Sequence, residues 1–348
     1  MASLDRSDGD RPVKAVASQL GGRNILRMTP ARTGGNNRIY RVEFDDRSLA
    51  ALKSYPSQMT DARDRLGAEF SALSFLKRHG VKEVPSAIAA DPETGFALYE
   101  WIEGSTVDSC RESDIDAAVE FCRRLRDLTT AADAQSLPIA SEACLSGADI
   151  QYQVERRHWR LRGVAVEDAT LRQFLENEFE PVRERVDRWA IDGFADEGMD
   201  FDVGLPLDKR TLSPADFGFH NTLRREDGTL TFVDLEYFGW DDPVRLVAEF
   251  TQHPGMDLGR EMSWRFHDKA CDLFAADDQF RNRMRLLYPA LGLRWCLIML
   301  NEFLPERWIR RIYAGEKADR AQVLARQLEK ARSNLARVVR FMEIGDIG

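Results

Sequence analysis

The sequence predicts an α+β protein with a small N-terminal lobe on an antiparallel sheet and a larger, mostly helical C-terminal lobe. Strand candidates dominate the first third of the chain, and amphipathic helical stretches dominate after Ser113. Between the two patterns, the segment EGSTVDS at 103–109 is rich in turn residues. We therefore expect domains at 1–103 and 104–348. The length of 348 residues agrees with two cores at about 150 residues per domain.

The strand candidates of the first lobe are short apolar or alternating segments bounded by turn residues. They lie at 24–28, 39–44, 48–55, 86–90 and 96–102. Asp45 and Asp46 join the second and third of these as an antiparallel hairpin. Thr60 is expected to N-cap a helix that ends near His79, with Gly80 as its C-terminal stop.

The second lobe shows helical periodicity over long stretches. Helices are expected at roughly 114–130, 150–162, 168–190 and 324–342. Ser113 and Asp116 resemble a capping box at the start of the first of them. A short β insertion is expected between 209 and 236, and Asp242 and Pro243 have the pattern of an N-cap and a first helical residue.

Composition narrows the class of protein. The 58 acidic and 49 basic side chains give a net charge of −9, which disfavours nucleic acid or an anionic membrane as the main partner. The five cysteines are scattered without a CxxC pair, so neither a disulfide framework nor a zinc ribbon is indicated. The acidic N-terminus does not resemble a signal peptide and no segment has the length of a membrane span, so we expect a cytoplasmic protein.

A carboxylate lies on the apolar stripe of the helix expected after 60. Glu69 falls between Leu66 and Leu73 on that face. A buried unpaired carboxylate costs several kcal/mol, so a cation is expected to meet it, and Lys53 on the preceding strand is the candidate. The alternative is that Glu69 lies at the end of the stripe and reaches water.

The pair Asp227 and Gly228 is the strongest hairpin signal in the chain. With a two-residue turn, the register would place Asn221 opposite Asp234, about 5 Å apart at their Cβ atoms. An amide oxygen and a carboxylate would then lie together. Magnesium is usually held by such oxygen ligands at phosphoryl-transfer sites.

Asp216 precedes Asn221 by five residues. The loop between them allows the Asp216 carboxylate to face the same cavity as Asn221 and Asp234 and to accept a proton there. Taken singly, Asp216, Asn221 and Asp234 are as well explained as turn or capping residues. Their order, spacing and expected register together favour a catalytic site.

The order of these motifs resembles the aminoglycoside phosphotransferase family, which is related in fold to protein kinases and choline kinases. The match covers the loop TGGNNRIYRV, Lys53, Glu69, Asp216 with Asn221, and Asp234. The usual signature of that family is H-G-D, four residues and Asn. Here DFGFHN keeps the spacing, but Ser213, Pro214 and Ala215 precede it and the histidine is absent.

The resemblance implies a bilobal protein-kinase-like fold and an ATP-dependent kinase that uses Mg²⁺ and phosphorylates an alcohol. It implies that Lys53 holds the α and β phosphates and that Glu69 orients Lys53. It further implies that Asp216 is the base and that Asn221 and Asp234 bind magnesium. The loss of the histidine bears on how the catalytic loop is braced more than on the identity of the base.

Two further nucleotide contacts follow from the resemblance. The phosphates would meet backbone N–H groups of the loop at 33–38, which contains Gly34 and Gly35, and also Asn36 or Asn37. Backbone groups near Glu100 and Ile102 would meet the adenine edge.

The acceptor is expected to be a small molecule with a hydroxyl group, a carbohydrate or an amino-alcohol, or an aminoglycoside-like compound. The family's C-lobe helices point to the stretch RWCLIMLNEF, especially Trp295, Asn301 and Glu302. Hydrogen bonding at a helix terminus explains Asn301 and Glu302 equally well.

Two other functions remain as alternatives. An ATP-binding pseudokinase would account for the missing histidine, although it has no need for both base and metal ligands. A nucleotidyltransferase on the same fold would use the same metal site with a reversed ATP pose.

For Glu236, Asp242 and His220, structural roles are the preferred interpretation.

Overall fold

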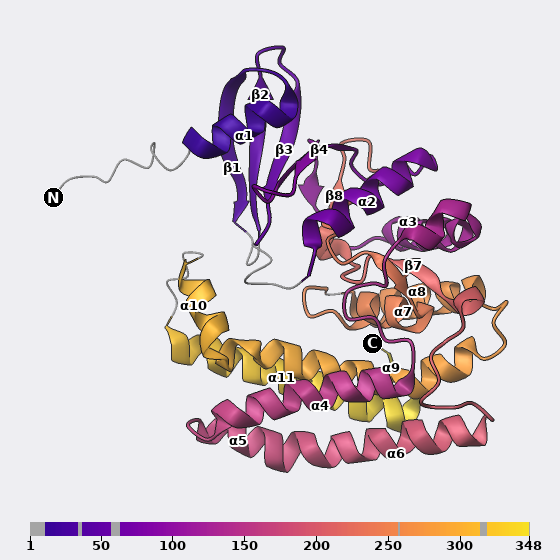
Figure 1. Ribbon diagram of the computed structural model, residues 1–348. Helices are drawn as coiled ribbons and strands as arrows, with labels where there is room; N and C mark the ends of the chain where they lie inside the picture. The colour runs from indigo at the N-terminus through magenta and orange to yellow at the C-terminus, as the bar shows by residue number, and fades with distance from the viewer. Residues whose placement is uncertain (1–10, 34–36, 57–62, 257, 314–318, 348) are drawn as a thin grey trace. The chain divides into compact units, whose positions relative to one another are not determined.

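The computed structural model describes residues 11–33, 37–56, 63–256, 258–313 and 319–347 (Figure 1). Their contacts group them into two compact units, which are described separately. The first unit comprises the described residues of Met1–Thr106, Ala132–Pro138 and Asn221–Phe238. The second comprises those of Val107–Ala131, Ile139–His220 and Gly239–Gly348. The expected boundary at 103 and 104 remains a prediction, and the grouping by contacts adds residues 221–238 to the N-terminal part.

The first unit is built on an antiparallel sheet of five strands in the order β1-β2-β3-β5-β4 (Figure 1). Its elements are α1 (Arg11–Gly21), β1 (Ile25–Thr33), β2 (Arg38–Phe44), β3 (Leu49–Ser54), α2 (Arg65–Arg78), β4 (Ala87–Asp91), β5 (Phe96–Glu100), β6 (Ser105–Thr106), η2 (Ala132–Ser136), β8 (Thr222–Arg224) and β9 (Leu230–Phe232). Alternate residues of β2 are buried, so one face of the strand packs into a core with Ala17 of α1.

Helix α2 begins later than the sequence indicated. Its N-cap is Asp64, whose carboxylate accepts the Gly67 N–H at 2.9 Å, and Thr60 lies outside the described residues. The expected stop is confirmed, because Gly80 adopts a left-handed φ of 75° that favours glycine. The buried stripe of α2 contains Glu69.

The predicted register of the hairpin at 222–232 is wrong by one residue. Thr222 pairs with Phe232 and Arg224 with Leu230, so Asn221 does not lie opposite Asp234. The loop has three residues instead of two, since Arg225 pairs with Thr229 through a 2.9 Å backbone bond and Gly228 is left-handed, with a φ of 84°. This is a type I turn followed by a glycine bulge, the usual three-residue hairpin. Asp234 lies beyond the end of β9.

The second unit is mainly helical, as expected. Its elements are α3 (Glu112–Asp127), η1 (Leu128–Thr130), α4 (Gly147–Ala165), α5 (Ala169–Gln173), η3 (Phe174–Phe179), α6 (Glu180–Asp196), η4 (Leu207–Lys209), β7 (Thr211–Ser213), η5 (Phe219–Asn221, whose last residue belongs to the first unit), β10 (Gly239–Asp241), α7 (Pro243–Gln252), α8 (Gly259–Leu273), α9 (Phe280–Met299), η6 (Leu300–Phe303), α10 (Pro305–Tyr313) and α11 (Arg320–Ile344).

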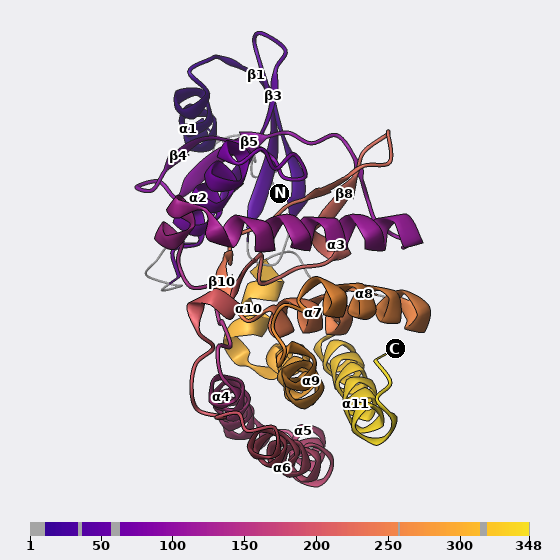
Figure 2. The same cartoon turned by 90° about the vertical axis from the view of Figure 1, so that its right-hand side faces the viewer.

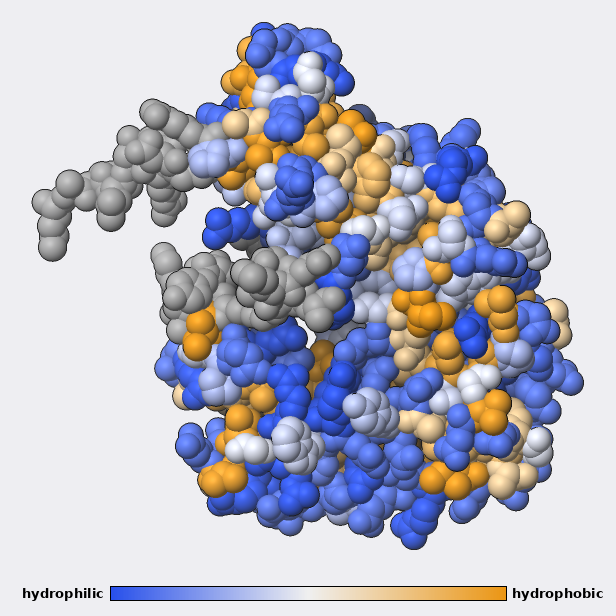
Figure 3. Space-filling model, in the orientation of Figure 1, coloured by the Kyte–Doolittle hydropathy of each residue, from blue (hydrophilic) through white to orange (hydrophobic). Residues whose placement is uncertain are grey.

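Helix α9 is the centre of the second unit, with α4, α6, α7 and α11 packed around it. Figure 2 views α4, α9 and α11 nearly along their axes. Polar residues cover most of the face of this unit that Figure 3 shows, with apolar residues scattered among them. Within the described parts of the chain, no helix has both the length and the apolar character needed to span a bilayer.

Of the two N-terminal caps expected for helices of this unit, one is confirmed and one is wrong. The carboxylate of Asp242 accepts the Val244 N–H at 2.8 Å with Pro243 at the first helical position, so this N-cap is confirmed. The capping box at Ser113 and Asp116 is wrong. Helix α3 starts two residues earlier than expected, with Arg111 as its N-cap, and the Asp114 carboxylate accepts the Arg111 N–H at 2.7 Å.

A cluster of aromatic rings fills the core between α3, α7 and α8. The ring of Phe250 stacks on Phe266 at 3.9 Å and packs against Phe217 and Phe219 at 5.0 and 5.1 Å. Phe217 and Phe219 come from the loop that follows β7, so this core anchors the loop that contains Asp216.

Replacing Phe250 with alanine should lower the free energy of unfolding by about 3–5 kcal/mol, because the ring is fully buried and its removal leaves a cavity. Urea denaturation followed by circular dichroism measures this. The matched control is Trp159→Ala on α4, where 76% of the residue is exposed and the change should stay within about 0.5 kcal/mol. Equal losses in the two variants would contradict this account of the core.

Candidate active site

The first unit buries a lysine among carboxylates. Lys53 on β3 is 4% exposed, and its Nζ lies 2.5 Å from Glu69 Oε2 and 3.5 Å from Glu236 Oε2. Nζ also donates to Asp234 Oδ1. The expected pairing of Lys53 with Glu69 is therefore present, and Glu69 does not reach water. Burial lowers the pKa of Lys53, but the charges of Glu69, Asp234 and Glu236 outweigh burial and raise the pKa above its ordinary value.

Glu69 has a full set of partners. Its Oε2 accepts the Tyr55 hydroxyl at 2.6 Å in addition to Lys53, and its Oε1 accepts the Leu235 N–H at 3.2 Å. Because the Tyr55 proton points to Glu69, Tyr99 donates to the Tyr55 oxygen at 2.6 Å. Burial raises the pKa of Glu69, and the Lys53 charge opposes that effect. The carboxylate is thus held in one orientation by three donors.

Glu236 extends this ion cluster. Its Oε1 accepts Arg65 Nη1 at 2.7 Å and its Oε2 accepts Asn37 Nδ2 at 2.5 Å. Asn37 is one of the residues expected to contact the nucleotide phosphates, whereas Arg65 was not predicted as a site residue. Glu236 lies two residues after Asp234, and this spacing was the signal that it shares the same face. Nothing in the sequence connects Arg65 with Glu236.

Three carboxylates, those of Glu69, Asp234 and Glu236, gather around Lys53, and Arg65 binds Glu236. Asp234 is the most exposed of the three, with 35% of its side chain accessible, and it has a left-handed φ of 66°. An accessible carboxylate oxygen suits a hard cation such as Mg²⁺.

Asn221, the other expected metal ligand, is joined to the same segment through the backbone. Its carbonyl accepts the Val233 N–H at 2.9 Å, next to Asp234. This bond keeps the two residues close even though the predicted side-by-side register is wrong.

The other expected nucleotide contacts are described only in part. Gly34, Gly35 and Asn36 lie outside the described residues. Glu100 is the last residue of β5, and its N–H is bonded to the Ser86 carbonyl at 2.9 Å. Ile102 lies beyond the strand end and takes no part in the backbone pairing of the sheet.

In the second unit, Asp216 follows a strained turn. Ala215 adopts a φ of 65°, which costs roughly 1–2 kcal/mol for a residue with a Cβ. Its N–H donates to Ser213 Oγ at 3.1 Å, and its carbonyl accepts Arg245 Nη2 at 3.4 Å. The usual family signature has glycine at this position, so the φ explains that preference. Serine and arginine hold the turn here.

Two histidines surround the Asp216 carboxylate. His220 Nε2 lies 3.1 Å and His253 Nε2 lies 3.4 Å from Asp216 Oδ1. The sequence analysis preferred a structural role for His220, although its spacing of four residues from Asp216 was a usable signal. His253 was missed because only the fold brings the end of α7 to this loop.

Of the expected acceptor residues, Trp295 lies closest to this group. Its ring meets His253 edge-on at 4.6 Å and 86°, and the residue is 7% exposed. Asn301 and Glu302 are half-buried in η6, and the Asn301 carbonyl accepts the Leu304 N–H at 3.0 Å. Their roles toward an acceptor stay predictions.

A separate pocket of about 190 Å³ opens in the second unit between the start of α4, residues 199–206 and α9. Three of its charged members are in ion pairs. Arg283 binds Asp242 and Asp277, and Lys209 binds Asp277. Asp216 is not among the residues that line it.

The comparisons with known proteins agree with this geometry. The family model described as phosphotransferase enzyme family, APH, matches residues 27–245. The chain belongs to this family. Membership confirms both the resemblance drawn from the motifs and the expected enzyme class, a phosphotransferase. No match was found among curated proteins.

Solved structures with the same fold include choline kinase LicA from Streptococcus pneumoniae, with 17% identity, a TM-score of 0.60, and coverage of 94% of this chain and 99% of that chain. The gentamicin complex of APH(2")-IIa has 15% identity, a TM-score of 0.59 and 97% coverage of both chains. Spectinomycin phosphotransferase APH(9)-Ia has 10% identity, a TM-score of 0.60, and coverage of 94% and 98%. The expected kinase-like fold is confirmed.

We expect His253 to make folding depend on pH. Burial, with a smaller contribution from His220, lowers its pKa from 6.5 to about 3, while Asp216 opposes the shift. Between pH 6.5 and 3 the unfolded chain binds a proton that the folded chain does not. The free energy of unfolding should therefore fall as the pH is lowered through this window, and stay unaffected by His253 above it.

Urea denaturation of the natural protein and of His253→Asn at pH 7, 6 and 5 tests this expectation. The stability difference between the two proteins should shift by up to about 2 kcal/mol from pH 7 to 5, at the expense of the natural protein. Identical pH dependence of the two proteins would show that His253 is protonated in the folded state as readily as in the unfolded state.

Proposed function

We propose that the protein transfers the γ-phosphoryl group of ATP, with Mg²⁺, to a hydroxyl group of a small molecule. The observation that carries this proposal is the buried Lys53 between Glu69 and the more exposed Asp234. A lysine held in this way is suited to bind phosphate oxygens, because its position is set before the nucleotide arrives.

In this proposal, residues of the first unit bind different parts of the nucleotide. Lys53 binds the α and β phosphates, and Glu69 keeps the ammonium group oriented. Asn37, which immediately precedes β2, donates to Glu236 and ties the start of that strand to it. The adenine edge meets backbone groups near Glu100 and Ile102.

Asp234 and Asn221 are the residues that would hold Mg²⁺, since they offer a carboxylate and an amide oxygen. When bound, Mg²⁺ supplies neutralisation of the charge that develops on the phosphates. Lys53 offsets the same charge from the protein side.

Asp216 acts on the acceptor. Its carboxylate accepts the proton of the acceptor hydroxyl as the oxygen attacks the γ-phosphorus, and it aligns that hydroxyl beforehand. The neutral ring of His253 beside Asp216 agrees with this role, because it adds no positive charge next to the carboxylate.

The acceptor class we propose is an amino-alcohol, a carbohydrate or an aminoglycoside-like compound. The similar structures include a choline kinase and phosphotransferases bound to gentamicin and spectinomycin. Trp295 supports this choice, since an aromatic ring near the base favours a cationic or sugar ligand.

The decisive experiment incubates the protein with Mg²⁺, ATP and a panel of amino-alcohols, sugars and aminoglycosides, and resolves both nucleotide and acceptor products by mass. A kinase yields ADP and an acceptor heavier by one phosphate. Pyrophosphate would indicate nucleotidyl transfer, and ATP binding without any product would indicate a pseudokinase.

Asp216→Asn should lower turnover by at least about 10²-fold while the nucleotide Kd changes by less than about threefold. The amide cannot accept the hydroxyl proton, but it keeps the shape of the carboxylate. ADP formation and fluorescent-nucleotide titration measure the two quantities. Turnover close to that of the natural protein would remove Asp216 from the mechanism.

Asp234→Ala should weaken nucleotide binding in the presence of Mg²⁺ by about tenfold or more, because the accessible carboxylate of the cluster is lost. Binding without Mg²⁺ should change far less. Calorimetric titration with and without the metal makes the comparison, and Asp227→Ala in the exposed hairpin loop is the matched control. The same metal dependence in all three proteins would contradict the assignment.

A further inference from the structure

The Asp216 carboxylate lies against a stacked pair of imidazole rings. His220 Nε2 is 3.1 Å from Asp216 Oδ1. The ring of His253 lies parallel to that of His220, with 3.7 Å between centroids and 5° between planes. The ring of Trp295 also contacts that of His253, with 4.6 Å between centroids and 86° between planes. A side chain of this loop is thus fixed by a ring from the end of α7.

We propose that His220 and His253 are positioning residues that together replace the missing signature histidine and hold Asp216 in the orientation required for proton acceptance. The inference rests on the proposed role of Asp216 as the base. His220 acts directly through its hydrogen bond, and His253 acts through the ring of His220. Neither ring stands at the position of the signature histidine, which would be residue 214.

The surroundings of His220 select the tautomer that this role needs. Its Nδ1 is buried and has no hydrogen-bond partner among the described residues. A buried N–H without an acceptor costs about 1–3 kcal/mol, so the proton is better placed on Nε2. From there it is donated to Oδ1 of Asp216.

The surroundings of His253 are equally specific. Its Nδ1 accepts the Gly255 N–H at 3.0 Å, so the ring proton is on Nε2, which faces Asp216 at 3.4 Å. The depressed pKa of the ring, which burial causes first and His220 second, agrees with a neutral imidazole. A neutral His253 ring supports the stack without adding positive charge beside the carboxylate.

The same observations argue against a transition-metal site at these three side chains. The two rings are stacked with 3.7 Å between centroids and only 5° between planes, so their Nε2 lone pairs lie in separate, nearly parallel planes and do not both point at one ion. The Gly255 N–H also requires Nε2 of His253 to carry the proton. Orientation of Asp216 is the role that fits both facts.

The turn that carries His253 is joined to the loop that carries Asp216. The Phe219 N–H donates to Met256 Sδ at 2.9 Å. A Cβ at Gly218 would lie 2.7 Å from His220 Nδ1 and 2.9 Å from Met256 Sδ, so only glycine allows this close approach.

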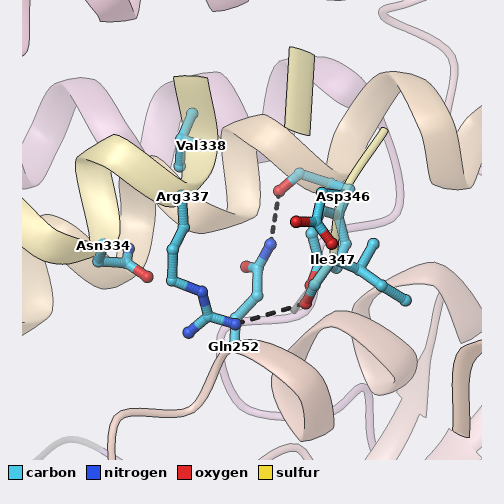
Figure 4. A pocket seen from close by; sticks show the side chains of 7 residues that line it. Gln252, Asn334, Arg337, Val338, Asp346 and Ile347 are labelled. Carbon is cyan, nitrogen blue, oxygen red and sulfur yellow. Dashed lines mark hydrogen bonds between the residues drawn. The ribbon is translucent and has the colours of Figure 1, made fainter. Parts of the chain in front are cut away.

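The end of α7 is itself held in place. Gln252, the residue before His253, donates its Nε2 to the Tyr288 carbonyl of α9 at 2.9 Å (Figure 4). In the same view, the C-terminal segment packs beside Gln252, where Arg337 donates to the Ile347 carbonyl. The stack therefore rests on a rigid support, which a positioning residue requires.

The test measures kcat and KM for ATP from ADP formation, with MgATP and water or a panel compound as the acceptor. His220→Phe keeps a ring but loses the donor, and should lower kcat by about 10- to 100-fold with KM for ATP within about threefold. His220→Gln restores a donor of similar reach and should recover most of kcat. Equal kcat in His220→Phe and the natural protein would overturn the inference.

A double-mutant cycle tests whether His253 acts through His220. His253→Ala removes the stack and should lower kcat by about 10-fold, but in the His220→Phe background it should add less than about threefold. If the loss of kcat in the double variant equals the product of the two single losses, His253 does not act through His220, and this part of the inference is overturned. Thermal unfolding of each variant separates this effect from a loss of folded protein.

The matched control is His79→Phe. His79 also binds an aspartate, Asp133, at 2.8 Å, but at the end of α2 in the first unit, so kcat should be unchanged. ADP formation by the natural protein with unaffected His220 variants would overturn this inference alone. Absence of ADP from the natural protein with every acceptor would overturn the proposed function and the inference together.

Discussion

The ammonium group of Lys53 is buried, and a buried charge is tolerated only when opposite charges and hydrogen-bond partners surround it. This requirement explains most of the first unit. Strand β3 supplies the lysine, α2 supplies Glu69, and the segment after β9 supplies Asp234 and Glu236. Lys53 and the carboxylates come from three separate parts of the chain, so the cluster forms only when these parts are correctly packed. The cluster thereby links folding of the unit to the geometry of its candidate nucleotide site.

The second unit also contains a buried cation surrounded by carboxylates, and there the cation is an arginine. Arg245 is buried between Asp241 and Glu249, and Arg294 from α9 binds the same glutamate at 2.5 Å. Burial raises the pKa of Asp241 to about 6, and the Arg245 charge opposes that shift. Such networks contribute little net stability but select one arrangement of the helices. Because Arg245 also binds the Ala215 carbonyl, the network extends to the loop of Asp216.

Elements with a strong local signal were predicted well. The five strands of the sheet, the α2 stop at Gly80 and the N-cap at Asp242 all follow from neighbouring residues. The hairpin register failed because a left-handed Gly228 allows either a two- or a three-residue loop, and the choice shifts every pair by one. The start of α3 failed for a similar reason, since Arg111, Ser113 and their neighbours offer several capping solutions of nearly equal energy.

The sequence by itself determined the chemistry of this protein: the order of lysine, glutamate, aspartate and asparagine along the chain predicted a phosphotransferase, and the buried stripe around Glu69 predicted a cationic partner. Only the tertiary structure decided which distant residues complete the site. Arg65 and Asn37 meet Glu236, and His253 stacks on His220, through contacts between segments far apart in sequence. Local periodicity reports on neighbours along one element, whereas these contacts depend on how separate elements pack.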